Sequence, residues 1–212
     1  MGEELLQTAW QTLNTPDWKL EKKLDNGDMV QVKTVKGKKL FKLTGYVRMS
    51  PRQLLEELFY KIEEVPRWNP TLTDCRIIQP IDQFTDISYQ VSQSVSLKSS
   101  QSTQLGVQVC AEAGGGVVST RDFVNLRHWA LMEGGVFVSA GGSIKHPAMP
   151  PQHKKVRGEN GPGCWAMRPV EGDLEMCLFQ WLLDTDLKVD RGRSKYLFLT
   201  NLMSRVGFLS PS

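Results

Sequence analysis

Strand-like segments joined by short turns fill the sequence from Arg121 to about Lys188, and this run constrains the fold more than any other feature. The segments lie near 122–132, 136–145, 153–159, 163–169 and 174–186. Gly134 and Gly135 mark the turn of one hairpin, because glycine adopts the positive φ angles of tight turns without steric cost. Consecutive strands with short connections predict a large antiparallel sheet.

Residues 17–49 have the same character. Strand-like runs occur at 18–22, 29–32 and 40–47. Asn26-Gly27 is a strong hairpin turn signal between the first two runs, and Lys36-Gly37 is a turn signal between the next two. These features predict an antiparallel meander, and two further strand-like runs at 74–78 and 85–91 add to the sheet.

Apolar residues recur at helical spacing in two places. One set is Leu5, Leu6, Ala9, Trp10 and Leu13, and the other is Leu54, Leu55, Leu58 and Ile62. The first set predicts a short amphipathic helix that ends before Pro16. The second predicts a helix that begins with a Ser50 cap and Pro51 at its first position, and that ends at Pro66. Helices beside a large antiparallel sheet are typical of the α+β class, and we expect one domain over 1–212.

Composition and charge exclude several classes of protein. The net charge of +3 is too small for a dedicated nucleic-acid binder, although it is compatible with a weak attraction to anionic membranes. No apolar run approaches the roughly 18 residues of a membrane span, and the first residues contain early acids rather than a signal peptide. The cysteines, Cys75, Cys110, Cys164 and Cys177, form no CxxC pair. We therefore expect reduced thiols in a cytoplasmic monomer, and no metal or other cofactor.

No motif for catalysis is present in the sequence. The nucleophile elbow, the phosphate-binding loop and the zinc-protease helix are all missing. His128, His146 and His153 are scattered over different segments, and Asp184 and Asp186 are typical of a solvated strand end. The sequence therefore predicts a protein that is not an enzyme.

One arginine stands out because it occurs in an otherwise apolar strand. Alternation along 121–129 places Phe123, Asn125, Arg127 and Trp129 on one face. If that face looks inward, the guanidinium costs several kcal/mol unless it is paired or hydrogen-bonded. Two interpretations remain open at this point. Arg127 points to solvent or pairs at a sheet edge, or it anchors the hydroxyl or keto group of an apolar ligand.

Several segments together resemble the START domain family. They are Trp68-Asn-Pro, Ile87-Ser-Tyr, Val117-Val-Ser-Thr-Arg-Asp-Phe-Val-Asn-Leu-Arg127, Pro150-Pro, Val156-Arg-Gly-Glu-Asn-Gly-Pro-Gly163 and Leu183-Asp-Thr-Asp-Leu-Lys188. The resemblance covers about residues 3–188. It is strongest to the subgroup of the steroidogenic acute regulatory protein, a late-endosomal START protein and a silkworm carotenoid-binding protein.

The resemblance implies a helix-grip fold, in which a curved antiparallel sheet and a long C-terminal helix enclose a tunnel for one lipid. Members of the subgroup bind cholesterol or lutein and carry it between membranes without chemistry. By position, Arg127 matches the cavity arginine of the family and Asn69 matches an asparagine near the pocket, while Gln90 replaces a cavity acid. Ser139 and Ser143 are further candidates for a ligand hydroxyl, and Trp129 shares the face of Arg127.

Two segments depart from the family pattern. Residues 93–109 are rich in Ser and Gln and resemble extra sequence from alternative splicing. The match stops after Lys188, and 189–212 predict only a shortened helix over about 194–206. We therefore expect a domain that binds and transfers a sterol or a carotenoid and touches membranes transiently. The alternative is a truncated splice isoform with impaired binding and a regulatory role or none.

Overall fold

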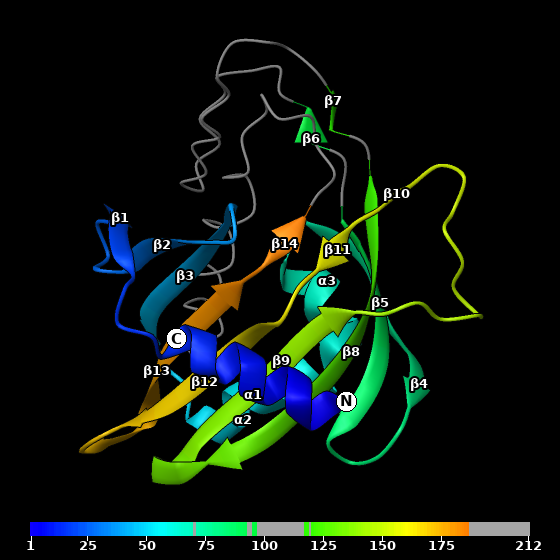
Figure 1. The fold of residues 1–212 in the computed structure, drawn as a ribbon. Helices are drawn as coiled ribbons and strands as arrows, with labels where there is room; N and C mark the ends of the chain where they lie inside the picture. Colours follow the sequence, from blue (N-terminus) through cyan, green and yellow to red (C-terminus); the bar gives the residue numbers. More distant parts are fainter. Residues whose placement is uncertain (70, 93–94, 97–116, 119, 187–212) are drawn as a thin grey trace.

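The computed structural model describes residues 1–69, 71–92, 95–96, 117–118 and 120–186. Most of this chain forms one sheet, antiparallel except where β10 pairs with β8 in parallel, with helices packed on both of its faces (Figure 1). The strands of the main sheet are β1 Lys19–Lys23, β2 Met29–Val35, β3 Lys38–Val47, β4 Leu72–Pro80, β5 Thr85–Ser92, β8 Arg121–Met132, β9 Val136–Ser143, β10 Val156–Arg157, β12 Gly163–Val170 and β13 Asp173–Leu183. Shorter pairs are formed by β6 Val95–Ser96 with β7 Val117–Val118 and by β11 Glu159–Asn160 with β14 Thr185–Asp186.

The strand order in the sheet is β1-β2-β3-β13-β12-β9-β8-β5-β4. The sheet is open, because β1 and β4 form its two edges and do not pair with each other in the part of the chain described. All three predicted turn signals are confirmed: Gly27 has a φ of 90°, Lys36 and Gly37 have φ angles of 49° and 77°, and Gly134 and Gly135 have φ angles of 74° and 73°. The predicted strand over 153–159 is wrong, since only the short strands β10 and β11 form there.

The two helical regions cover opposite faces of the sheet. Helix α1, Gly2–Leu13, buries Leu6, Ala9 and Leu13 against the outer face, as its apolar spacing predicts. The second region packs Leu54, Leu55, Leu58 and Phe59 against the inner face, where Met167 and Phe179 lie. The inner face therefore has a helical cover over part of its area.

The second helical region is broken rather than continuous. It consists of α2 Pro51–Leu55, a π-helical turn η1 Glu56–Tyr60, a 3-10 turn η2 Ile62–Glu64 and α3 Val65–Trp68. The predicted start is confirmed by a capping box between Ser50 and Gln53. The predicted end is wrong, because Pro66 lies in the first turn of α3, where a proline costs no helical hydrogen bond.

Several predictions fall on residues outside the described ranges. These are the insert over 93–109 apart from β6, Cys110, and the shortened helix over 194–206. Within the described residues, no helix is both long enough and apolar enough to cross a bilayer.

Candidate functional site: a cavity on the inner face of the sheet

A largely apolar cavity of about 150 Å³ lies between the inner face and the second helical region. Its described apolar lining is Phe41, Leu58, Ile62, Val65, Trp68, Leu72, Phe123, Trp165, Trp181 and Leu183. The polar groups at its edge are Lys39, Asn69, Thr71, Gln90, Asn160 and Thr185. A cavity with an apolar wall and a few polar groups suits a small hydrophobic ligand.

A second cavity of about 130 Å³ adjoins the first. The two share Gln90, Asn160, Trp165, Trp181, Leu183 and Thr185. The second cavity is more polar, since Asn125, Arg127 and Ser139 also line it. The site therefore consists of two adjacent cavities, one mainly apolar and one more polar.

Two glycines make the floor of the second cavity. Gly141 of β9 and Gly163 of β12 are directly paired across the sheet and both line the second cavity. A Cβ atom built on Gly141 would have only the Leu126 carbonyl oxygen within 4 Å, at 3.8 Å. The missing side chain of Gly141 therefore leaves open space beside Arg127, its partner on β8, whereas a Cβ on Gly163 would meet the Leu182 carbonyl oxygen at 2.8 Å.

Arg127 is buried and paired with an acid on the neighbouring strand. Its Nε donates to Oδ1 of Asp86 at 2.8 Å, and its Nη2 donates to Oδ2 at 2.6 Å. The side chains are only 5% and 7% exposed, and the two residues lie opposite each other on β8 and β5. The bidentate geometry compensates the buried guanidinium, and Arg127 does not point to solvent.

The same guanidinium also holds the helical cover. Nη2 donates to the carbonyl of Phe59 at 2.9 Å and Nη1 donates to that of Leu58 at 3.4 Å. The guanidinium carbon lies 4.3 Å from the centre of the Phe59 ring. Four of the five N–H groups are therefore used within the protein, and one remains on Nη1.

Gln90 and Ser139 lie at the cavity and keep hydrogen-bonding capacity. Gln90 lines both cavities and Ser139 lines the second. Neither side chain has a hydrogen bond to another residue of the described chain. Gln90 lies on the same face of β5 as Asp86, four residues further along the strand. The acid that compensates Arg127 is therefore at position 86 and not at position 90.

The other predicted residues have partners within the protein. Oδ1 of Asn69 accepts hydrogen bonds from the backbone and hydroxyl of Thr71, and Asn69 lines the first cavity. Ser143 does not line either cavity in the described chain; its hydroxyl donates to Asn125 and accepts from the backbone of Asn160.

Trp129 also lies away from the described lining of both cavities. Its indole donates to the hydroxyl of Tyr60 at 3.0 Å, and its ring packs against Phe84 and Phe137. These contacts place it in an aromatic cluster near the turn between β4 and β5, although it shares a face with Arg127 as alternation predicts.

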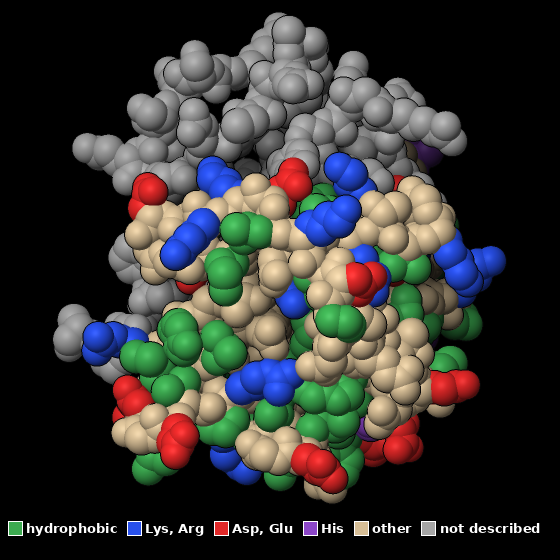
Figure 2. Space-filling model, turned by 60° about the vertical axis from the view of Figure 1, so that its left-hand side comes forward, with side chains coloured by type: hydrophobic (Ala, Val, Ile, Leu, Met, Phe, Trp, Pro, Cys, Tyr) green, Lys and Arg blue, Asp and Glu red, His purple; other side chains and the backbone are tan. Residues whose placement is uncertain are grey.

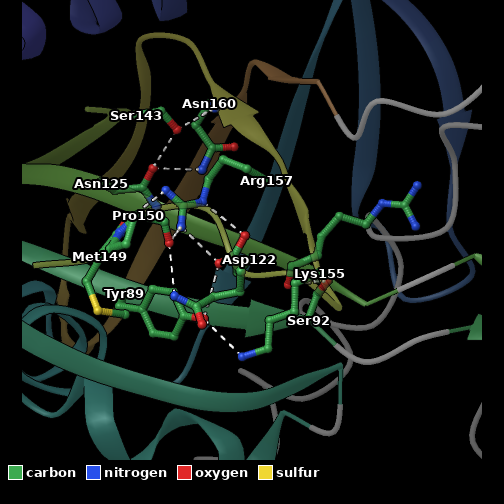
Figure 3. A network of polar contacts seen from close by, with 12 residues as sticks. Tyr89, Ser92, Asp122, Asn125, Ser143, Met149, Pro150, Lys155, Arg157 and Asn160 are labelled. Carbon is green, nitrogen blue, oxygen red and sulfur yellow. Dashed lines mark hydrogen bonds and ion pairs between the residues drawn. The ribbon is translucent and has the colours of Figure 1, made fainter. Parts of the chain in front are cut away.

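A second buried acid explains two of the sequence motifs. Asp122 of β8 is fully buried and accepts two hydrogen bonds from Arg157, at 2.9 and 3.0 Å, and one from Tyr89 (Figure 3). Arg157 also donates to the carbonyls of Met149 and Pro150. The pair thus fixes the long segment before β10 to the outer face of the sheet, so these motif residues support the fold rather than the cavity.

The three described cysteine thiols are buried and unreactive. Burial raises the pKa of each of them, Cys75, Cys164 and Cys177, to about 12. A thiol with such a pKa carries almost no thiolate at neutral pH, and thiolate is the nucleophilic form.

The fold and the cavity define an α+β domain of the helix-grip class. Residues 4–196 match the family described as START domain. The chain therefore belongs to the START domain family.

Relatives and solved structures agree with this assignment. The mitochondrial steroidogenic acute regulatory protein of Danio rerio is 38% identical over 189 residues, and that of Homo sapiens is 34% identical; each match covers 88% of this chain. The chain spans 60% of the length of these relatives. Human StAR-related lipid transfer protein 5 has a TM-score of 0.72 at 20% identity, covering 98% of this chain and 89% of that one. Human STARD10 has a TM-score of 0.66 at 17% identity, covering 87% and 67%.

Proposed function

We propose that this chain binds one largely apolar lipid with a polar end, either a sterol or a carotenoid, and carries it between membranes. The observation that supports this most is the pair of adjacent cavities: the first is lined mainly by aromatic and aliphatic side chains, and the second is lined in part by Gln90, Ser139 and Arg127. The names of the relatives, steroidogenic acute regulatory protein and StAR-related lipid transfer protein, support a lipid as the ligand.

The proposed role is transport without chemistry. Asp86, the buried acid beside the cavity, has both oxygens occupied by Arg127. The Cys164 thiol is held protonated by its raised pKa. No described cavity residue therefore combines a free nucleophile with a general base in hydrogen-bonding distance. A cytoplasmic location, peripheral to membranes, stays a prediction.

Thermal melting tests ligand binding directly. A ligand that binds only the folded chain at one hundred times its Kd adds about 2.7 kcal/mol of stability. For a chain of this size we expect the Tm to rise by about 5–10 °C with cholesterol or lutein. A cooperative melt that neither ligand moves would contradict the proposal. The absence of any cooperative melt would favour the truncated isoform with impaired binding.

The edge formed by β1, β2 and β3 is the surface that we propose contacts the membrane. Residues 19–42 contain eight lysines and three acids. Lys19, Lys22 and Lys23 are exposed on the edge strand, and exposed Lys39 lines the first cavity. Figure 2, which brings this side of the molecule forward, shows Lys and Arg side chains spread among hydrophobic ones. The cavity thus reaches the surface beside a basic edge.

Removing charge from this edge should weaken binding to anionic membranes. Each lysine near an anionic surface contributes about 1 kcal/mol, so K22Q/K23Q should reduce affinity for phosphatidylserine-containing vesicles by roughly tenfold or more. Neutral vesicles should show little change. The control is K145Q/K154Q, which removes the same charge from exposed lysines away from this edge. Equal losses for the two double variants in a vesicle sedimentation assay would contradict the assignment.

A further inference from the structure

Trp165 lies at the centre of the inner face, where the two cavities meet. It is in β12, opposite Ser139 of β9 on one side and Trp181 of β13 on the other. It lines both cavities. Its ring packs edge-on against Trp181, with the ring centres 6.4 Å apart. The indole is thus fixed in place between the first and the second cavity.

The N–H group of this indole is buried and has no hydrogen-bond partner among the residues that the structure describes. A buried donor without a partner costs about 1–3 kcal/mol, and buried tryptophans usually find an acceptor. Ser139, its direct neighbour across the strands, lines the second cavity, and its hydroxyl has no hydrogen bond to another described side chain. Two neutral hydrogen-bonding groups on neighbouring strands therefore have no partner within the described part of the chain.

The charged groups nearby are already compensated. Arg127 is paired with Asp86, and Asp184 is paired with Lys38. Among the described residues of the second cavity, an anionic ligand group would find no cation that is not already paired. Lys39 of the first cavity is exposed to solvent, so the desolvation of such a group would be poorly compensated. A neutral oxygen, in contrast, can accept from the indole and exchange a hydrogen bond with the serine hydroxyl.

We propose that the Trp165 indole N–H, with the Ser139 hydroxyl, binds a neutral oxygen of the ligand and makes the site specific for a lipid alcohol or ketone. This inference rests on the proposed function, because it assigns the polar contact within the same cavity. In this proposal two neutral groups make the polar contact to the ligand, and the Arg127 guanidinium, most of whose N–H groups are used within the protein, does not. The neutral groups lie two residues along the strands from the pairing of Arg127 with Gly141.

The test compares ligands that differ only in the oxygen. W165F keeps an aromatic ring and removes the N–H. We expect W165F to weaken binding of cholesterol about 5- to 10-fold while binding of 5-cholestene, which lacks the hydroxyl, changes less than about twofold. Lutein and β-carotene, measured in parallel by absorbance, provide a second pair. The matched control is W18F, because Trp18 also has a buried N–H with no partner in the described ranges but lies in the cluster on the outer face.

A second measurement does not depend on how the variant folds. The indole N–H resonance of Trp165 in the wild-type chain should move downfield with cholesterol and not with 5-cholestene. If W165F weakens both ligands equally, or if the resonance responds alike to both, Trp165 acts by packing alone and the inference is wrong. If the wild-type chain binds none of the four ligands, the proposed function itself fails.

Discussion

G141V is expected to weaken lipid binding by at least about 30-fold while the chain still folds. The new side chain would project into the second cavity, because a Cβ at Gly141 meets no atom closer than 3.8 Å. Filling space that the ligand needs costs about 2 kcal/mol or more in affinity. The unliganded variant should melt at the same temperature or higher, since valine is favoured in strands and glycine weakens them. Binding isotherms and thermal melts measure the two effects.

Two further substitutions test whether the loss of affinity comes from filling the cavity. G141A adds one methyl group and should give an intermediate loss of affinity. A130V adds comparable volume to the neighbouring strand β8 on the outer face, and should leave affinity unchanged. If G141V binds lipid as tightly as the wild-type chain, the ligand does not occupy the open space beside Gly141.

D86A is expected to destabilise the fold by about 3–5 kcal/mol, because it leaves the Arg127 guanidinium buried without its carboxylate. In urea, the midpoint of unfolding should fall accordingly. The exposed pair of Arg52 and Glu56 provides the control, with side chains 73% and 45% exposed. E56A should cost under about 1 kcal/mol, because exposed ion pairs contribute little to stability.

The double variant D86A/R127L distinguishes the stability lost by burying an unpaired charge from the stability lost with packing contacts. Replacing both partners of a buried pair by apolar groups is often close to neutral, so the double variant should recover much of the stability that D86A loses. Arg127 also holds the carbonyls of Leu58 and Phe59, so recovery should be incomplete. If D86A costs no more than E56A, Arg127 does not depend on Asp86 for its compensation.

Local sequence signals were sufficient for most of the sheet. Asn26-Gly27 and Gly134-Gly135 predicted their hairpins because the positive φ angles of those turns require residues like these. The break at Glu56–Tyr60 could not be predicted in this way. The apolar stripe there fits a continuous helix, whereas the carbonyls of Leu58 and Phe59 bond to an arginine almost seventy residues along the chain. The break in the helix therefore coincides with a contact between segments far apart in the sequence, which local signals do not show.

The candidate site was predicted in part. Alternation along β8 grouped Arg127 with Phe123, Asn125 and Trp129 on one face but left open whether that face looks inward, as it does in the structure. Its partner Asp86 was missed because neither strand alone determines the register between β5 and β8. The sequence did contain a signal for this partner, because Asp86 is an acid at the start of an apolar run and lies on the same strand face as Gln90. Trp165 was missed as well, because its free N–H is visible only once its neighbours are known.

Native mass spectrometry of the chain incubated with cholesterol and with lutein measures directly whether the folded chain binds one lipid. We expect a complex with one lipid per chain for the wild-type protein and for A130V, and its loss in G141V at the same concentrations. Uptake of neither lipid by the folded wild-type chain, or equal uptake by G141V, would contradict it.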